Sequence, residues 1–173
     1  MSLNWNYDTA RIGGDGISET RTASEAECSE VSEELGVIGC HHVSATYKIK
    51  PISGNRFLAQ GEISADIEQA CVVTLDPVAE RLSINFSVEF RPSDQIQHSD
   101  TLEFNDIDSE DPEPIENGQI RMGRFVYELI ASHCELYPRS GEETLDGLSS
   151  GRDAETKSHP FADLARLKSG HQS

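Results

Sequence analysis

Four cysteines and six histidines are the residues of this chain with the widest range of chemistry. Cys40, His41 and His42 are consecutive, and thiolate and imidazole are both zinc ligands. Neighbouring residues of a strand point to opposite faces, so at most two of the three would reach one ion. The chain has no C-x-x-C pair to supply the others. We therefore expect a loop leading into a strand here, with no metal and no cofactor.

Cys71 is the remaining candidate for a nucleophile or a redox centre. Such chemistry requires a base within hydrogen-bond reach and a lowered thiol pKa. None of the histidines stands in a recognisable motif with Cys71, so we expect a buried structural thiol. The glycine-rich stretch 13–16 also lacks the Lys-Ser/Thr of a phosphate-binding loop. We expect no enzyme, and a metal or redox protein centred on Cys71 is the alternative.

The charge balance narrows the class of partner. There are 31 Asp and Glu against 14 Lys and Arg, a net charge of -17. Affinity for RNA comes largely from cations that replace counterions on phosphates, so this balance disfavours RNA. An acidic surface favours a basic protein partner, although solubility alone is another reason for acidity.

The acidic residues are concentrated between Asp94 and Glu116, where nine acids occur without a Lys or Arg. A solvated loop is the usual form of such a run, and a site for a basic partner is the alternative. The residues predicted to bind that partner are Asp106, Asp108, Glu110, Asp111 and Glu113.

Direct RNA binding remains an alternative function. A local basic surface would use Arg81, Arg91, Arg121 and Arg124. Aromatic side chains that stack on bases would also be needed, but Phe57, Phe86 and Phe90 are in inward register. The sheet is therefore a poor platform for base stacking.

The elements that must position these residues follow from hydrophobic periodicity. A helix is predicted from a capping box at Thr22 and Glu25 to Gly36. Alternating strands are predicted at 43–50, 57–67 and 82–90, and the Cys71 segment is interpreted as a covered strand. A weaker strand is expected to contain Leu102 and Phe104. This order predicts an α+β fold: an antiparallel sheet or partly closed barrel of four to six strands with two flanking helices.

The two ends of the chain have a different character. We interpret the first 20 residues as an extended arm or loop, and their composition is not that of a secretory signal. No run approaches the roughly 18 apolar residues of a membrane span, so we expect a cytoplasmic protein.

A second helix is predicted from Gly123 to Glu135, ended by Pro138.

One domain is therefore expected over 1–138, followed by a flexible tail over 139–173 with a short helix at 160–168. The apolar face of that helix would dock on the domain or bind the partner, and it consists of Phe161, Leu164 and Leu167.

Three segments, taken in order, also carry a likeness to a known family. The first is 69–78 with the alternation that follows it. The second runs from Pro112 through 123–130 to Tyr137-Pro138, and the third is 159–168. The signature residues of the first are Gln69, Cys71, Thr74, Leu75 and Pro77. Together these segments resemble the YceD family, bacterial proteins linked to accumulation of large-subunit ribosomal RNA.

The resemblance implies a factor in large-subunit ribosomal RNA accumulation or processing, or in ribosome assembly. Combined with the acidity, it predicts binding to a basic ribosomal or RNA-processing protein, with ribosomal precursor RNA as the alternative partner. Many members carry a second Cys three residues after the position of Cys71, and some carry further Cys or His after the Tyr-Pro pair. These look like a metal set, but position 74 here is Thr and residues 138–141 contain no ligand.

Overall fold

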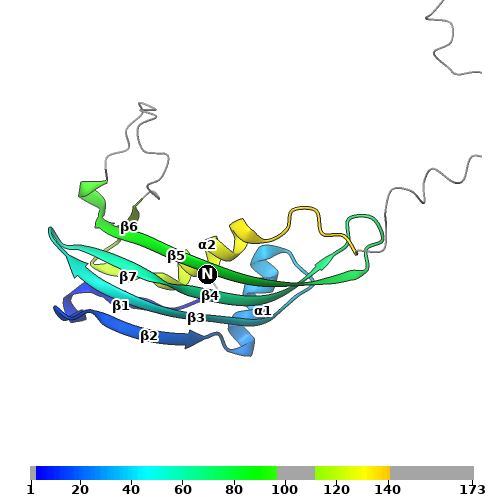
Figure 1. The fold of residues 1–173 in the computed structure, drawn as a ribbon, viewed down its shortest axis with the longest axis horizontal. Coiled ribbons are helices and arrows are strands. Elements are labelled where there is room, and N and C mark those ends of the chain that lie inside the picture. Colours follow the sequence, from blue (N-terminus) through cyan, green and yellow to red (C-terminus); the bar gives the residue numbers. More distant parts are fainter. Residues whose placement is uncertain (1–2, 97–111, 141–173) are drawn as a thin grey trace, which may run out of the picture. The chain divides into compact units, whose positions relative to one another are not determined.

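The computed structural model describes residues 3–96 and 112–140, and residues 1–140 form one compact unit. The helices and strands, in chain order, are β1 (Asn6–Asp8), β2 (Ile17–Thr22), α1 (Glu25–Leu35), β3 (Gly39–Ile52), β4 (Arg56–Ala70), β5 (Pro77–Pro92), β6 (Glu113–Ile115), β7 (Gln119–Arg121) and α2 (Met122–His133). Five strands form one open sheet in the order β2-β3-β4-β5-β6, and β1 pairs with β7 (Figure 1). The α+β prediction is confirmed. The sheet is mixed rather than wholly antiparallel, because β6 runs parallel to β5.

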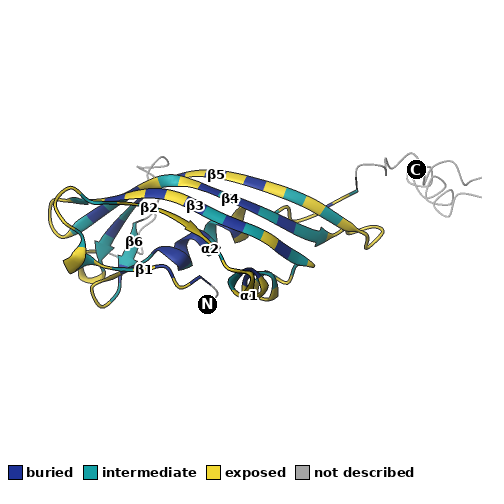
Figure 2. Ribbon diagram, turned by 90° about the horizontal axis from the view of Figure 1, so that it is seen from below, coloured by how far each residue is buried: buried dark blue, intermediate teal, exposed yellow. Residues whose placement is uncertain are grey.

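The three long strands, β3, β4 and β5, make the core by strict alternation. Val43, Ala45, Tyr47 and Ile49 of β3 are buried, and their neighbours along the strand are polar. Ile63 of β4 lies opposite Ala45 on one side and Ile84 of β5 on the other. Figure 2 shows this alternation as stripes along the strands, with both helices on one face of the sheet. The predicted alternations at 43–50, 57–67 and 82–90 are therefore confirmed.

Helix α1 begins two residues later than the predicted capping box. Thr22 is still part of β2, where it pairs with Ser44 of β3. The cap is Ser24: its hydroxyl accepts from the Glu27 amide at 3.3 Å, and the Glu27 carboxylate accepts from the Ser24 amide at 2.8 Å. The hydrogen bond from the Ser24 backbone lowers the pKa of Glu27. The predicted end is confirmed, because Gly36 caps the helix at a φ of 68°.

The N-terminal residues are part of the fold, so the prediction of an extended arm was wrong. Leu3 and Trp5 are buried in the core. β1 pairs with β7 and β2 pairs with β3, so these residues occupy two sheets. The Tyr7 and Tyr47 hydroxyls lie 2.8 Å apart, which joins β1 to the centre of the larger sheet. Burial of these two large apolar side chains removes their surface from water, and this favours an ordered N-terminal segment.

Helix α2 lies where it was predicted, beginning one residue earlier and ending two residues earlier. It spans Met122–His133, and Phe125, Val126 and Ile130 are buried. It ends five residues before Pro138, because Cys134 adopts an extended conformation. Within the described ranges, no helix is long and apolar enough to cross a membrane. The predicted strand with Leu102 and Phe104 and the predicted tail helix at 160–168 lie outside the described residues.

Gly123 is the closest contact between α2 and the N-terminal segment. Its amide donates to the Trp5 carbonyl at 3.0 Å, and a Cβ at this position would overlap the carbonyl of Leu3. We expect Gly123→Ala to lower the free energy of unfolding by about 1–3 kcal/mol, because the backbone of Leu3 must shift. Urea denaturation measures this loss. Gly13→Ala is the control: an added Cβ there meets nothing within 4 Å, so equal losses in both variants would contradict the prediction.

Candidate functional site

The segment from Cys71 to Asp76 is a tight turn between β4 and β5. The Cys71 amide donates to the Asp76 carbonyl at 2.8 Å, and the Leu75 amide donates to the Cys71 carbonyl at 2.9 Å. Leu75 adopts a φ of 65°, in the left-handed region. The prediction of a covered strand was wrong because these backbone groups bond to one another, and Val72, Val73 and Leu75 are exposed.

The Cys71 thiol lies inside this turn and is 1 % exposed. Its sulfur accepts from the Thr74 amide at 3.5 Å and from the Ser140 hydroxyl at 3.8 Å. Hydrogen bonds from the Thr74 side chain and backbone, then from Ser140 and Val73, lower the pKa of Cys71 to about 6, since they favour the thiolate. The thiol is buried, as predicted, but it is not part of the core cluster under the sheet.

The segment that follows α2 runs to the end of the sheet that carries this turn, as Figure 1 shows. The Val72 amide donates to the Pro138 carbonyl at 2.9 Å. Glu80 of β5 joins the same parts: its Oε2 accepts from the Gln69 side chain at 2.9 Å and from the Glu135 amide at 3.2 Å. Two segments more than 60 residues apart in sequence therefore form one surface at this end of the sheet. Thr74 and Ser140 both hydrogen-bond to the sulfur, and Thr74 occupies the position where the resemblance would place a second Cys.

A comparison with family models covers all three segments that carry the resemblance. Residues 59–168 match the family described as "Large ribosomal RNA subunit accumulation protein YceD". The chain belongs to the YceD family. That description implies a role in accumulation of large-subunit ribosomal RNA. No curated protein and no solved structure matches the chain.

Within the YceD match, the predicted signature residues meet at the β4–β5 turn. Cys71, Thr74 and Leu75 form the turn itself. Gln69 precedes it and binds Glu80, and Pro77 begins β5 opposite Ala70. Val72, Val73, Leu136 and Tyr137 are exposed around the turn, and none of them was predicted to be a binding residue. Their apolar type next to Asp76-Pro77 and Pro138 was the available signal, since prolines punctuate chain reversals.

The four arginines of the predicted RNA-binding alternative do not form a basic cluster. Arg81 and Arg91 both lie on β5, ten residues apart, which is about 33 Å along a strand. Arg121 and Arg124 lie where β7 passes into α2. The arginines predicted to bind RNA therefore lie at separate places on this YceD-family fold.

Each of these arginines pairs with a carboxylate of the same chain. Arg81 contacts Asp66 at 2.7 Å, Arg91 contacts Glu89 at 2.9 Å, and Arg121 contacts Glu116 at 2.8 Å. Arg124 contacts Glu128 at 2.7 Å and Glu116 at 3.7 Å. Hydrogen bonds from Arg81 and Arg91 hold the pKa values of Asp66 and Glu89 below their ordinary values. RNA phosphates would have to compete with these carboxylates.

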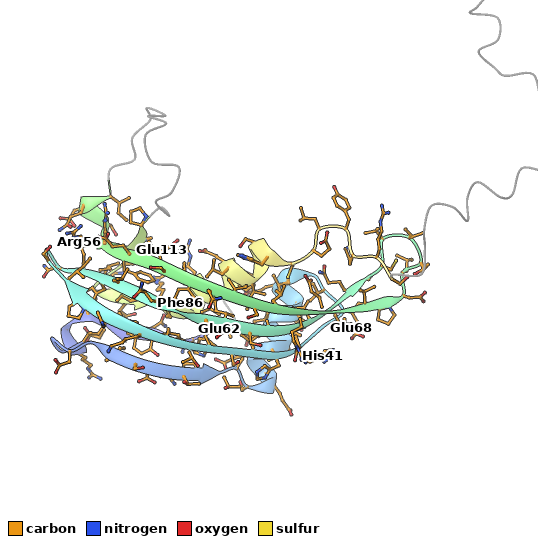
Figure 3. The ribbon with its side chains drawn as sticks, viewed as in Figure 1. His41, Arg56, Glu62, Glu68, Phe86 and Glu113 are labelled. Carbon is orange, nitrogen blue, oxygen red and sulfur yellow. The ribbon has the colours of Figure 1, made fainter. Side chains whose placement is uncertain are left out.

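Of the predicted acidic partner-binding residues, the structure describes only Glu113. It lies in β6, opposite Phe90 of β5, and is labelled in Figure 3. Burial raises the pKa of Glu113, with a further contribution from the charge of Glu128. The other predicted partner-binding residues lie outside the described residues: Asp106, Asp108, Glu110, Asp111, Phe161, Leu164 and Leu167.

The prediction of a loop at Cys40-His41-His42 was wrong, because all three residues lie in β3. In the described ranges no group of three or more potential metal ligands gathers. A bulge separates Cys40 from His42, and His41 points to Glu68, with 3.2 Å between Nε2 and Oε2 (Figure 3). Cys40 instead faces the core beside Cys28 and Cys134. Burial, then the neighbouring Cys28, raises the pKa of Cys40 to about 12.

Proposed function

We propose that this YceD-family protein is a non-enzymatic factor in large-subunit ribosomal RNA accumulation that binds a basic ribosomal or RNA-processing protein. The ion pairing of its arginines carries the proposal. Arg81, Arg91, Arg121 and Arg124 are already matched by carboxylates, and the whole chain has a net charge of -17. Such a surface repels a phosphate backbone and attracts a cationic protein.

Electrostatic attraction of this kind acts mainly on the rate of association and on partner choice. Ribosomal proteins are basic and abundant in the setting that the family description implies. A factor that binds one of them would affect the RNA indirectly, through assembly or through protection from processing. This mechanism requires neither a phosphate-binding loop nor an active site.

Affinity capture of the tagged full-length protein from its native lysate tests the proposal. Samples are split, one half is treated with nuclease, and captured proteins are identified by mass spectrometry. We expect one or a few basic ribosomal or RNA-processing proteins to be recovered equally from both halves. Loss of every partner after nuclease would contradict the proposal and favour an RNA-bridged association. Lys48 and Lys50, which are exposed on β3, would then be the next residues to test.

The acidic run gives a second test of the same proposal. Replacing Asp106, Asp108, Glu110 and Asp111 by Asn or Gln removes four negative charges without touching β6. We expect weaker capture of the basic partner, and a shallower dependence of the remaining capture on salt. Salt titration of capture measures both effects. Glu113 is left unchanged because it is half-buried in β6, and unaltered capture would remove the acidic run from the mechanism.

A further inference from the structure

Five exposed apolar side chains lie on the two segments that meet at the end of the sheet that carries the β4–β5 turn. We name them the end patch: Val72 (47 % exposed), Val73 (56 %), Leu75 (75 %), Leu136 (81 %) and Tyr137 (69 %). The hydrogen bond between Val72 and Pro138 holds the turn against the segment after α2, so both sets belong to one surface. Single exposed apolar residues are normal, but a contiguous group marks an interaction site.

The fold itself does not require apolar residues at these positions. Turns favour Gly, Asn, Asp and Ser, and positive φ is uncommon for a residue such as Leu75. The hydrogen bonds of the turn come from backbone groups, from Thr74 and from Cys71. Polar side chains at 72, 73 and 75 would keep all of them, so the hydrogen bonding of the turn does not account for the apolar type.

A small cavity of about 220 Å³ lies beside the end patch. Val78, Ala79 and Pro138 give it apolar walls, while the carboxylates of Glu80 and Glu135 outnumber the one cation, Arg139. An aliphatic stem that carries a positive head matches such a lining, and Lys and Arg side chains have this form. Asp76, which is exposed, adds a further negative charge next to Leu75.

We propose that the end patch and this cavity together are the docking surface for a basic protein segment. An apolar side chain of that segment covers Leu75 and Tyr137, and a neighbouring Lys or Arg enters the cavity toward Glu80 and Glu135. The inference rests on the proposed function and names the surface that performs it. A second copy of this chain does not fit this surface. It would bring the same carboxylates and the same net charge of -17, and the two copies would repel each other.

Capture with full-length variants tests the surface. The patch variant is Leu75→Ser with Leu136→Ser, and the cavity variant is Glu135→Gln. The matched control is Ile52→Ser, because Ile52 is apolar and 38 % exposed but lies in β3 outside the end patch. The probe is RNA-free protein extracted from purified large ribosomal subunits, with each bound protein quantified. Because the changed side chains are exposed, we expect each variant to keep the thermal midpoint of unfolding of wild type, and this measurement checks that the fold is intact.

We expect the patch variant to capture at least about ten-fold less of one basic protein than wild type, because removing side chains at the centre of an interface has an effect of this size. The cavity variant should lose less and Ile52→Ser should retain capture. If wild type captures a basic protein and the patch variant captures it equally, the docking surface is wrong while the proposed function stands. If wild type captures no basic protein from this probe or from nuclease-treated lysate, both are wrong.

Photocrosslinking identifies what covers the patch. A benzoylphenylalanine in place of Tyr137 should form an adduct with the captured basic protein in nuclease-treated lysate, and the same group at Ile52 should not. An adduct formed only with a second copy or within the chain itself would overturn the proposal.

Discussion

Replacing Phe125 by Ala is expected to lower the free energy of unfolding by about 3–5 kcal/mol, the cost of removing a buried aromatic ring. Phe125 projects from α2 and is only 7 % exposed. Its ring centre lies 5.3 Å from that of Phe86 and 5.9 Å from that of Phe90, both edge to face. These rings form the main contact between α2 and β5, so the variant should loosen the helix from the sheet.

Helix propensity acts in the opposite direction, since Ala is a better helix former than Phe by less than about 1 kcal/mol. A net loss therefore reports packing and not the helix backbone. Equilibrium urea denaturation of the full chain measures it. Leu136→Ala is the control: that side chain is 81 % exposed, and the expected change is within about 0.5 kcal/mol. A loss below about 1 kcal/mol for Phe125→Ala would show that the ring is not a core contact.

The parts of the fold that could be predicted are those with one buried face. The alternation at 82–90 left a single register in which Leu82, Ile84 and Phe86 all face inward, and this is the observed one. Phe125, Val126 and Ile130 likewise follow the period of a helix. An element that is buried on one side has apolar residues at regular intervals, and this periodicity made these elements recognisable.

The parts that could not be predicted lack such a signal. β1 is three residues long, and β2 turns Glu19 and Arg21 toward the inner side, where Arg21 donates to the Tyr7 hydroxyl at 3.3 Å. A polar edge strand of this kind shows no hydrophobic alternation. Val72 and Val73 led to the wrong prediction of a covered strand. Their apolar type suggested burial, but residue type alone does not separate an exposed apolar side chain from a buried one.

The candidate site depended on long-range contacts for the same reason. The contact between Val72 and Pro138 joins segments with no local relationship, and only the folded chain shows it. The pair Arg124 and Glu128, at helical i,i+4 spacing, could be recognised from sequence. The pair of Arg81 with Asp66 required the register between β4 and β5. The residues of the β4–β5 turn could therefore be recognised from sequence, and the structure showed that the segment after α2 contacts this turn.

The second large expected effect concerns the titration of Cys71. Hydrogen bonds led by those of Thr74 lower its pKa from 9.0 to about 6, so we expect the folded protein to hold a thiolate at neutral pH. We expect Thr74→Ala to move this pKa back toward 9.0, because the hydroxyl that favours the thiolate is lost. Thr74→Ser keeps the hydroxyl and should keep the low pKa. Ultraviolet absorbance of the thiolate against pH, taken as the difference from Cys71→Ser, measures each pKa.

The same shift predicts how stability depends on pH. A pKa that is lower in the folded state than in the unfolded state adds stability that is complete above about pH 9 and is lost as the pH falls through about 6. The free energy of unfolding of wild type minus that of Cys71→Ser should therefore rise between pH 6 and pH 9. Thr74→Ala should flatten this rise and Thr74→Ser should preserve it, as urea denaturation at pH 6, 7.5 and 9 would show. A difference that stays constant across this window would mean that the turn stabilises the thiol and the thiolate equally, contrary to the hydrogen bonding around its sulfur.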